Sequence, residues 1–229
     1  MNLDIEFEKR KPWITRFEIN KISYGGSFDA LNDARLTQFF ECFPQAETIL
    51  ELGSLEGGHS FGLAKNPRVK TVTAIEARAA NLKKARFIKD VIGDEKVKFV
   101  EADLQKTNLA DFGKFDAIFC SGLLYHLPKP WELLNQFNKI SSNVFIWTQY
   151  AGEEEAEKIV EGYRGKWYQE SGWSDPLSGV SEKSFWLSLG SLVEILTDNE
   201  FKNLKIIDKN PHHPHGRAIT FAASTSKID

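Results

Sequence analysis

Most features that would assign this chain of 229 residues to a class at a glance are scarce or missing. It has two cysteines, Cys42 and Cys120, far apart in apolar surroundings, which predict buried thiols in a reducing compartment and no disulfide framework. No apolar run approaches the length of about 18 residues that a membrane-spanning helix needs. Positive charge is not in excess either, because the net charge is -3 and the isoelectric point is about 6.0. We therefore expect no global attraction to nucleic acid or to a membrane.

The beginning of the chain also lacks the apolar stretch of a secretion signal, since residues 1–11 read MNLDIEFEKRK. Neither an internal repeat nor a low-complexity tract is found in the sequence. The length suits one α/β domain that spans residues 1–229 and buries a full core. We therefore expect a single-domain cytoplasmic protein, and the sequence leaves open whether it forms homo-oligomers.

What is present is a glycine-rich turn in the stretch Thr48–Ser60, TILELGSLEGGHS. A short, strand-like apolar run stops at Gly53, and the pair Gly57-Gly58 precedes a segment that can open a helix. Glycines at the end of a strand let the backbone approach a ligand closely, because no Cβ intervenes. Glu51 ends the strand with a carboxylate, where a phosphate site would avoid negative charge. The stretch therefore predicts a ligand that carries a cation, such as an ammonium group.

This pattern resembles motif I of the class I S-adenosylmethionine (SAM)-dependent methyltransferases. The acid-x-Gly-x-Gly-x-Gly of that family is matched at Glu51, Gly53 and Gly57, while Leu55 replaces the middle glycine. An NAD(P)-linked oxidoreductase is the nearest alternative, but its G-x-G-x-x-G motif would need a glycine at position 55. The resemblance implies an enzyme with SAM as its cofactor and a doubly wound α/β fold. Its sheet would have seven strands, mostly parallel, with the seventh strand antiparallel.

Apolar, β-branched runs alternate with helical patterns along the rest of the chain. The predicted strands after the first are Lys70–Ile75, Val97–Val100, Phe115–Cys120, Asn143–Trp147, Asn203–Asp208 and Ala218–Ala222. The predicted helices are Asp29–Phe43, Ala79–Ile92, Pro130–Ile140, Glu153–Val160 and Leu187–Asn199. Such alternation predicts a parallel sheet with its ligands at the carboxyl ends of the strands.

Two carboxylates near predicted strand ends extend the cofactor site. Glu76 follows the second strand, near the spacing from Glu51 at which nucleoside-binding folds place an acid for the ribose hydroxyls. The resemblance further implies that Asp103 accepts a hydrogen bond from the adenine amino group and that Leu104 packs on the ring. The residues predicted to bind the cofactor are Glu51, Gly53, Ser54, Gly57, Glu76, Ala77, Asp103, Leu104 and Ser121.

The passage after the fourth strand, Ser121–Pro130, carries the candidate catalytic residues. In the resembled family this passage runs beside the methyl group that is transferred. His126 is predicted as a general base, since histidine titrates near neutral pH, and Tyr125 as the residue that orients an acceptor hydroxyl. The alternative for His126 is a structural role, in which it caps the following helix or braces the loop. Methyl transfer can also proceed by orientation alone, because the sulfonium of SAM is already a strong electrophile.

Two segments outside the core pattern are expected to cover the cavity. Residues 1–28 would be an N-terminal cover, although Trp13 and Phe17 fit equally well as padding on the flank of the sheet. Residues 151–186 are rich in aromatic side chains and are predicted as a helical, aromatic lid. Aromatic walls suit a flat or apolar acceptor, or an amine held by cation–π contact, whereas the alternative is a hydrophobic mini-core. The residues predicted to contact the acceptor are Tyr24, Trp147, Tyr150, Trp167, Trp186 and His213.

Three histidines, His212, His213 and His215, lie in the connection between the last two predicted strands. Such a cluster invites a metal site, but no nearby cysteine or acid completes a ligand set, and the two prolines fit a plain turn. We therefore predict no metal here and expect the connection to contact the acceptor.

The sequence GLLYHLPKPWELL, residues 122–134, looks like the corresponding passage of small-molecule methyltransferases. It is also similar to the enzymes that carboxymethylate wobble uridine in tRNA, but these need a basic surface, and this chain shows no basic stripe. We therefore predict methyl transfer to oxygen or nitrogen of a small aromatic or apolar acceptor, with neither a nucleic-acid nor a membrane partner. The alternatives are the tRNA-modifying enzyme and a SAM-binding domain without catalysis.

Overall fold

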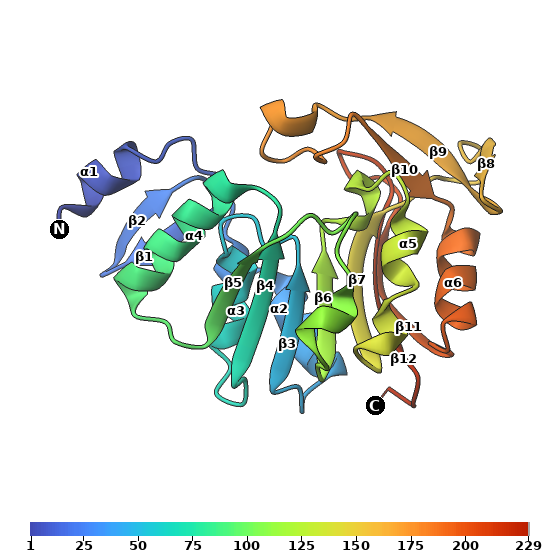
Figure 1. Cartoon of the computed structure of the whole chain (residues 1–229), viewed down its shortest axis with the longest axis horizontal. Helices are drawn as coiled ribbons and strands as arrows, with labels where there is room; N and C mark the ends of the chain where they lie inside the picture. The colour runs from blue at the N-terminus through green and yellow to red at the C-terminus, as the bar shows by residue number, and fades with distance from the viewer. Residues whose placement is uncertain (229) are drawn as a thin grey trace.

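A mixed sheet of seven strands forms the centre of the computed structural model, which describes residues 1–228 (Figure 1). In their order across the sheet the strands are β11 (Asn203–Asn210), β12 (Ala218–Ser224), β7 (Asn143–Gln149), β6 (Ala117–Ser121), β3 (Thr48–Leu52), β4 (Thr71–Glu76) and β5 (Val97–Glu101). The strands β3 to β7 run parallel to one another, whereas β12 is antiparallel to both of its neighbours. The predicted mostly parallel sheet with a reversed last strand is therefore confirmed.

Alternate side chains of the central strands enter two separate hydrophobic cores, as expected for a sheet that is covered on both faces. On β3, Ile49 joins one core, while Leu50 and Leu52 join the other. The core of Leu50 includes residues of α5 (Pro130–Leu134) and α6 (Leu189–Asp198). The core of Ile49 includes residues of α1 (Leu3–Glu8), α2 (Ala34–Cys42), α3 (Gly58–Ala64) and α4 (Ala79–Ile92). The doubly wound arrangement follows from this division.

Two helices were predicted in the first half of the chain, and one of them has the predicted limits. Helix α4 has the predicted limits, Ala79–Ile92. The predicted helix Asp29–Phe43 is divided into a 3-10 turn, Ala30–Asn32, and the helix α2. The division occurs because the side chain of Asp33 accepts a hydrogen bond from the backbone N–H of Arg35 and thereby caps α2.

Two helices in the second half of the chain were also predicted. The predicted helix Leu187–Asn199 is observed as α6, with the side chain of Ser188 as its N-cap. The predicted helix Pro130–Ile140 is shorter than expected, because α5 ends at Leu134 and a separate 3-10 turn follows at Phe137–Lys139. The passage from β6 therefore ends in compact turns packed on the sheet.

The N-terminal segment forms a hairpin of β1 (Arg16–Ile19) and β2 (Ile22–Gly25) (Figure 1). Trp13 and Phe17 are buried in the core of this segment, where the ring of Trp13 contacts Phe87 on α4. Both side chains therefore pad the flank of the sheet, as one of the two interpretations predicted.

A buried carboxylate fastens the N-terminal segment to the glycine-rich turn. Glu56 is fully buried and accepts hydrogen bonds from the backbone N–H groups of Ile14 (3.0 Å) and Thr15 (2.7 Å). It also pairs with Nζ of Lys84 at 2.7 Å. Thr15 lines the cavity described below, so this segment contributes to the cavity wall, and its role as a cover stays a prediction.

Residues 151–186 contain a small antiparallel sheet instead of the predicted helical lid. Its strands are β8 (Lys158–Val160), β9 (Tyr163–Gln169) and β10 (Lys183–Leu187), and it lies above the edge at which the parallel strands end (Figure 1). The predicted helix Glu153–Val160 is wrong, because its first residues form a turn and its last three are β8. Ile159 and its β-branched neighbour favour a strand, and Glu161 and Gly162, both with positive φ, make the two-residue turn into β9.

The two cysteine thiols are buried and unpaired, as predicted. Cys42 belongs to the core of Ile49 and Cys120 to the core of Leu50, so the sheet separates them. Burial raises the pKa of both thiols. Among residues 1–228, no helix combines the length and the apolar character that crossing a bilayer requires.

Candidate active site

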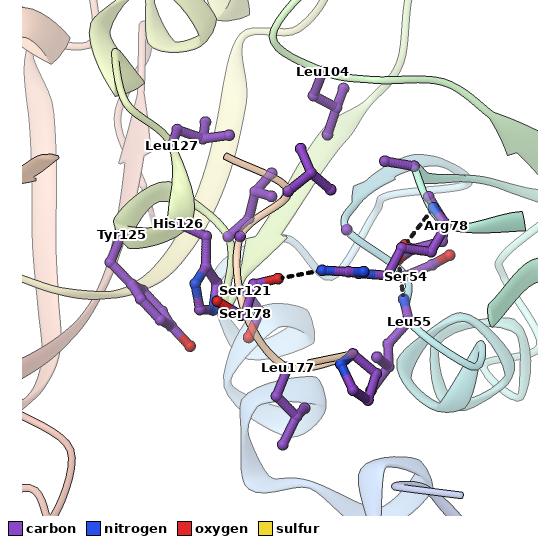
Figure 2. A pocket seen from close by; sticks show the side chains of 18 of the residues that line it. Ser54, Leu55, Arg78, Leu104, Ser121, Tyr125, His126, Leu127, Leu177 and Ser178 are labelled. Carbon is purple, nitrogen blue, oxygen red and sulfur yellow. Dashed lines mark hydrogen bonds between the residues drawn. The ribbon is translucent and has the colours of Figure 1, made fainter. Parts of the chain in front are cut away.

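A cavity of about 550 Å³ opens at the edge where the parallel strands end. Its walls come from the turns after β3, β4, β5 and β6, from the N-terminal segment, and from the loop between β9 and β10. We call this last segment, residues 170–182, the lid loop. Figure 2 shows Leu55 and Arg78 on one side of the cavity and Tyr125 and His126 on the other. The cavity therefore has a glycine-turn half, formed at the ends of β3 to β5, and an aromatic half, formed by the turn after β6, the end of β7 and residues of β9 and β10.

The backbone of the glycine-rich turn explains its residue types. Gly53 and Gly57 have φ angles of 79° and 83°, and a Cβ on Gly57 would lie 2.7 Å from the ring of Phe99. Leu55 also has a positive φ, 50°, at the position where the resembled motif has a glycine. Its backbone N–H donates a hydrogen bond of 2.8 Å to Oε2 of Glu76. One carboxylate thus stabilises a left-handed leucine that would otherwise be strained.

Carboxylates at the end of β4 and just after β5 line the glycine-turn half. Glu76 is 8% exposed and accepts hydrogen bonds from the backbone N–H groups of Leu55 and Arg78, the latter at 2.9 Å. Burial raises the pKa of Glu76, although these hydrogen bonds oppose it. Asp103 and the buried side chain of Leu104 also line this half. The strand ends therefore bring the predicted acids to one wall.

The hydroxyl of Ser54 is a buried polar atom without a hydrogen-bond partner among the described residues. Such a group costs about 1–3 kcal/mol, so a ligand that bonds to it is favoured. Gly53 and Ala77 line the same wall. An unpaired hydroxyl, two carboxylates and an apolar leucine fit a nucleoside that carries a cationic tail, which is the chemistry of SAM.

Glu51 and Gly57 do not line the cavity, so the prediction that Glu51 faces the ligand is wrong. The side chain of Glu51 is buried and accepts a hydrogen bond from the hydroxyl of Ser60 on α3. Burial raises the pKa of Glu51 to about 7, although the bond to Ser60 opposes it. The reason is strand geometry, because Glu51 stands between Leu50 and Leu52 and points to the opposite face of the sheet.

The aromatic half combines rings with polar groups. Tyr125 packs edge-on against Trp147 and Trp186, with ring centroids 5.8 Å and 6.1 Å away. Trp147 in turn contacts His213 at 5.6 Å. The indole Nε1 of Trp186 is buried and has no partner among the described residues. Trp147, Trp186 and His213 therefore lie in the wall where contact with the acceptor was predicted.

Three other predicted contacts lie elsewhere. Tyr24 stacks on another ring of the N-terminal segment, at 4.7 Å, and Tyr150 is buried in the hydrophobic core. Trp167 is 43% exposed and packs on a ring of β10. Their predicted places in the cavity wall are wrong, since none of the three lines it. On β9 the alternation of side chains puts Tyr168, and not Trp167, on the cavity side.

Glu170, the first residue of the lid loop, is a site residue that the sequence analysis missed. Its Oε1 lies 3.0 Å from Nδ1 of His126 and accepts a hydrogen bond from the hydroxyl of Ser184 (2.7 Å). Its Oε2 accepts hydrogen bonds from the hydroxyl of Ser178 (2.5 Å) and the backbone N–H of Gly179 (2.9 Å). Burial by itself raises the pKa of Glu170, but these four hydrogen bonds outweigh burial and lower the pKa to about 2.

The ionised Glu170 holds His126 in one orientation. Because a carboxylate only accepts hydrogen bonds, Nδ1 of His126 donates to it, and Nε2 is left to accept a proton. Tyr125 cannot act as a base beside it, because burial raises the pKa of its hydroxyl to about 12 and keeps it protonated. The two partners are 44 positions apart in the chain, and no local motif marks Glu170.

A second polar group, also missed by sequence analysis, stands beside Ser121. The guanidinium of Arg35 donates a hydrogen bond of 2.8 Å to the hydroxyl of Ser121 and lies 4.8 Å from the ring centre of Trp147. Asp33 forms an ion pair with Arg35 and contacts Nε2 of His59 at 3.2 Å. Burial alone raises the pKa of Asp33, but its bonds to His59 and Arg35 lower it well below the usual range. The charge of Arg35 is therefore compensated.

The histidine-rich connection after β11 reaches the aromatic half, where His213 and His215 line the wall. Their ring centroids lie 5.7 Å apart. Across the part of the chain that the structure describes, no three His, Cys, Asp or Glu side chains are placed to share a metal ion. Contact of this connection with an acceptor stays a prediction.

The fold and the cavity together define a class of protein. A glycine-rich turn after the first central strand, carboxylates near the next two strand ends and a reversed last strand are the features of a class I SAM-dependent methyltransferase. A family model described as a methyltransferase domain matches residues 50–142. The chain belongs to the class I SAM-dependent methyltransferases, and SAM is its cofactor.

Solved structures support this assignment. The N-terminal domain of EvdMO1, in the presence of S-adenosylhomocysteine (SAH) and D-fucose, is 30% identical with a TM-score of 0.88, over 98% of this chain and 96% of that chain. A structure of EvdMO1 is 27% identical with a TM-score of 0.77, over 97% of this chain but only 46% of the other. Magnesium protoporphyrin IX methyltransferase (ChlM) from Synechocystis PCC 6803, with bound SAM, shares the fold at 13% identity and a TM-score of 0.57, over 86% and 78% of the two chains. No curated protein matches the chain.

Proposed function

We propose that this enzyme transfers the methyl group of SAM to a hydroxyl oxygen of a small, uncharged, sugar-like acceptor. The prediction from sequence left oxygen and nitrogen open and favoured an aromatic or apolar acceptor. The proposal narrows the target atom to oxygen and replaces the aromatic or apolar acceptor by a sugar-like one. The observation that carries it is the pair of His126 and Glu170 in the aromatic half. Such a positioned base favours transfer to an alcohol, because the proton of the hydroxyl must leave as the oxygen attacks.

The composition of the aromatic half supports a sugar-like acceptor. Rings of Tyr125, Trp147 and Trp186 offer apolar faces, while Gln149 and the unpartnered indole N–H of Trp186 offer polar groups. A sugar presents the complementary surface, with C–H groups on its faces and hydroxyls at its edges. The similar domain of EvdMO1 was crystallised in the presence of D-fucose, which is an uncharged sugar.

The charges around the cavity disfavour an anionic acceptor. Arg35 is paired with Asp33, and Arg78 donates its hydrogen bonds to backbone carbonyls. No lysine lines the cavity among residues 1–228. Recognition of a phosphate group needs cations that are free to pair with it. A sugar phosphate or a nucleic acid is therefore a poor acceptor in this proposal.

The glycine-turn half would hold SAM. Glu76 would accept hydrogen bonds from the ribose hydroxyls and Asp103 from the adenine amino group, with Ala77 and Leu104 against the ring. The free hydroxyl of Ser54 would bond to the amino-acid end. When bound, SAM supplies a methyl group on a sulfonium, which is a strong electrophile.

In the aromatic half, Nε2 of His126 takes the proton of the acceptor hydroxyl while the oxygen attacks the methyl carbon. The carbon–sulfur bond breaks, its electron pair stays on sulfur, and the products are a methyl ether and neutral SAH. Glu170 stabilises the imidazolium through its bond to Nδ1, and the proton then passes to solvent. Tyr125, which stays protonated, orients the acceptor oxygen by donating a hydrogen bond.

The test is an assay of SAH formation from SAM with D-fucose, other uncharged sugars, their phosphates and simple amines. We expect turnover with uncharged sugars. His126→Asn should lower kcat by about 10²- to 10⁴-fold, because the variant keeps a polar side chain but has no base. Its affinity for SAH, measured by calorimetry, should stay within about twofold of the wild type, since His126 lies in the other half of the cavity.

His212→Asn is the matched control, because His212 is exposed and does not line the cavity. Full turnover in His126→Asn would leave catalysis by orientation alone and remove the base. Methylation of an amine or a sugar phosphate, but of no uncharged sugar, would overturn the proposed class of acceptor.

A further inference from the structure

Arg78 reaches from the glycine-turn half of the cavity into the lid loop. It is the N-cap residue of α4 and is 7% exposed. Its guanidinium donates hydrogen bonds to the carbonyl oxygens of Gly172 (2.8 Å), Trp173 (3.1 Å) and Ser178 (3.0 Å). It also lies 5.0 Å from the ring centre of Trp173. An arginine that bonds to three carbonyls of one loop limits the conformations of that loop.

The same residue is tied to the turn that we expect to hold the ribose. The backbone N–H of Arg78 donates a hydrogen bond of 2.9 Å to Oε1 of Glu76, whose Oε2 accepts from Leu55. A second contact between this side of the cavity and the lid loop joins two uncharged side chains. In it, the hydroxyl of Ser181 donates a hydrogen bond of 2.9 Å to Oε1 of Gln105. Arg78 therefore provides the charged attachment of the lid loop to the glycine-turn half.

The lid loop also reaches the candidate base. Ser178, whose carbonyl oxygen accepts from Arg78, donates its hydroxyl to Oε2 of Glu170. The other oxygen of Glu170 meets Nδ1 of His126. A Cβ on Gly179 would lie 2.4 Å from the carbonyl oxygen of His126, so the loop packs directly on the backbone of the base. Figure 2 shows Ser178 between Arg78 and His126.

We propose that Arg78 is a positioning residue for methyl transfer. It fastens the lid loop over the cofactor, and the fastened loop orients His126 through Ser178 and Glu170. Because Leu177 and Ser178 line the cavity, closing of the loop completes the cofactor site and the base together. The role given to His126 rests on the proposed function, whereas the fastening of the loop does not.

The first measurement needs no acceptor, because it uses SAH as the probe. Arg78→Ala, Arg78→Lys and the control Arg86→Ala, which changes an exposed residue on the same helix, are compared with the wild type. Stopped-flow release of SAH and amide hydrogen exchange of residues 170–182 are measured. In Arg78→Ala we expect both to be about tenfold faster or more, since three hydrogen bonds are lost. For Arg78→Lys, both rates should lie between those of the wild type and Arg78→Ala. For Arg86→Ala, both rates should match those of the wild type.

The second measurement tests the connection to the base. Nitrogen-15 NMR of the His126 ring, assigned with His126→Asn, reports which ring nitrogen carries the proton. With SAH bound, the wild type should show one tautomer, protonated at Nδ1. Arg78→Ala and Glu170→Gln should both show a mixture of tautomers. The double variant should resemble Glu170→Gln, because the two residues act through the same ring.

Each outcome decides one part of the proposal. Unchanged SAH release and loop exchange in Arg78→Ala would overturn the fastening. Faster release with an unchanged ring signal of His126 would overturn the connection to the base. If Arg78→Ala does not fold, Arg78→Lys carries the same test with an expected change of about threefold. If no uncharged sugar is methylated, the proposed function fails, while the measurements with SAH still decide the role of Arg78.

Discussion

Hydrogen-bond donors decide the charge of buried carboxylates in this enzyme. Glu51 has one hydroxyl partner, Ser60, and burial raises its pKa to about 7. Glu170 is also buried but accepts four hydrogen bonds, which lower its pKa to about 2 despite the burial. At neutral pH, Glu170 is therefore fully ionised and able to hold His126, whereas Glu51 is partly protonated.

Replacing Glu51 by glutamine should remove a pH dependence of stability. Between its ordinary pKa of 4.5 and the folded value of about 7, the folded state binds more protons than the unfolded state. The wild type therefore loses stability as pH rises through this window. Glu51→Gln should be more stable than the wild type by about 1–3 kcal/mol at pH 8, with no advantage at pH 4.5. Urea unfolding at both pH values measures the difference.

The control is Glu18→Gln, which changes an exposed carboxyl on β1 and should leave the pH dependence as it is. Equal pH slopes in the wild type and in Glu51→Gln would contradict the buried position of Glu51.

At the scale of elements, the N-terminal segment and the lid loop both line the cavity. Each is attached to the body of the protein by a buried charged side chain that bonds to its backbone. Glu56 accepts hydrogen bonds from the N-terminal segment at Ile14 and Thr15. Arg78 donates hydrogen bonds to the lid loop. In both cases a side chain near the glycine-rich turn satisfies backbone groups of a segment that is distant in sequence, so a buried charge contributes to the attachment of each segment.

Removing the carboxylate of Glu56 should destabilise the protein strongly. Glu56→Ala leaves the buried ammonium of Lys84 without its carboxylate and two backbone N–H groups without their acceptor. We expect a loss of about 3–5 kcal/mol in the free energy of unfolding, measured by urea denaturation. The matched control is Glu47→Ala, which breaks an exposed Glu–Lys pair with Lys70 and should change stability little. Similar losses in both variants would contradict the importance of burial.

At the scale of the whole molecule, the N-terminal segment, the lid loop and the sheet meet at one cavity. A ligand bound there is therefore expected to stabilise elements from the entire chain. Residues 15 and 28 of the N-terminal segment, the turns after the central strands, and the lid loop all line it. The two hydrophobic cores below it are shared by the same central strands. Occupation of the cavity is therefore expected to raise the stability of the fold as a unit.

Saturation with SAH should raise the melting temperature. At 100 times its Kd, SAH contributes about 2.7 kcal/mol, which corresponds to about 5–10 °C for a chain of this size. Glu76→Ala should show a much smaller shift at the same concentration, because the proposed bonds to the ribose hydroxyls are lost. Differential scanning fluorimetry measures both. Glu101→Ala, at the register partner of Glu76 on β5 with an exposed side chain, is the control. An undiminished shift in Glu76→Ala would contradict the ribose assignment.

The succession of strands along the chain and the edge of the sheet at which the cavity lies were predictable from sequence. The apolar runs around Leu50, Ile75 and Phe119 predicted the central strands, and the glycines after β3 predicted the turn that opens the cavity. These signals are local, because strand periodicity and turn chemistry depend on residues close together in the chain. Glu76 followed from its place at a strand end and its spacing from Glu51, whereas Asp103 followed from the family resemblance, and both line the cavity.

Only the tertiary structure decided which side chains meet. Glu170 reaches His126 across 44 positions because β9 and β10 pair above the sheet, and no local pattern encodes that contact. Glu51 turns away from the cavity, and Tyr168 takes the place expected for Trp167, because a strand sends neighbouring residues to opposite faces. The sequence by itself therefore determined the class I fold and the edge of the sheet at which the cavity lies. The pairing of distant segments determined the carboxylate that contacts His126 and the attachment of the lid loop, since long-range contacts depend on register and packing.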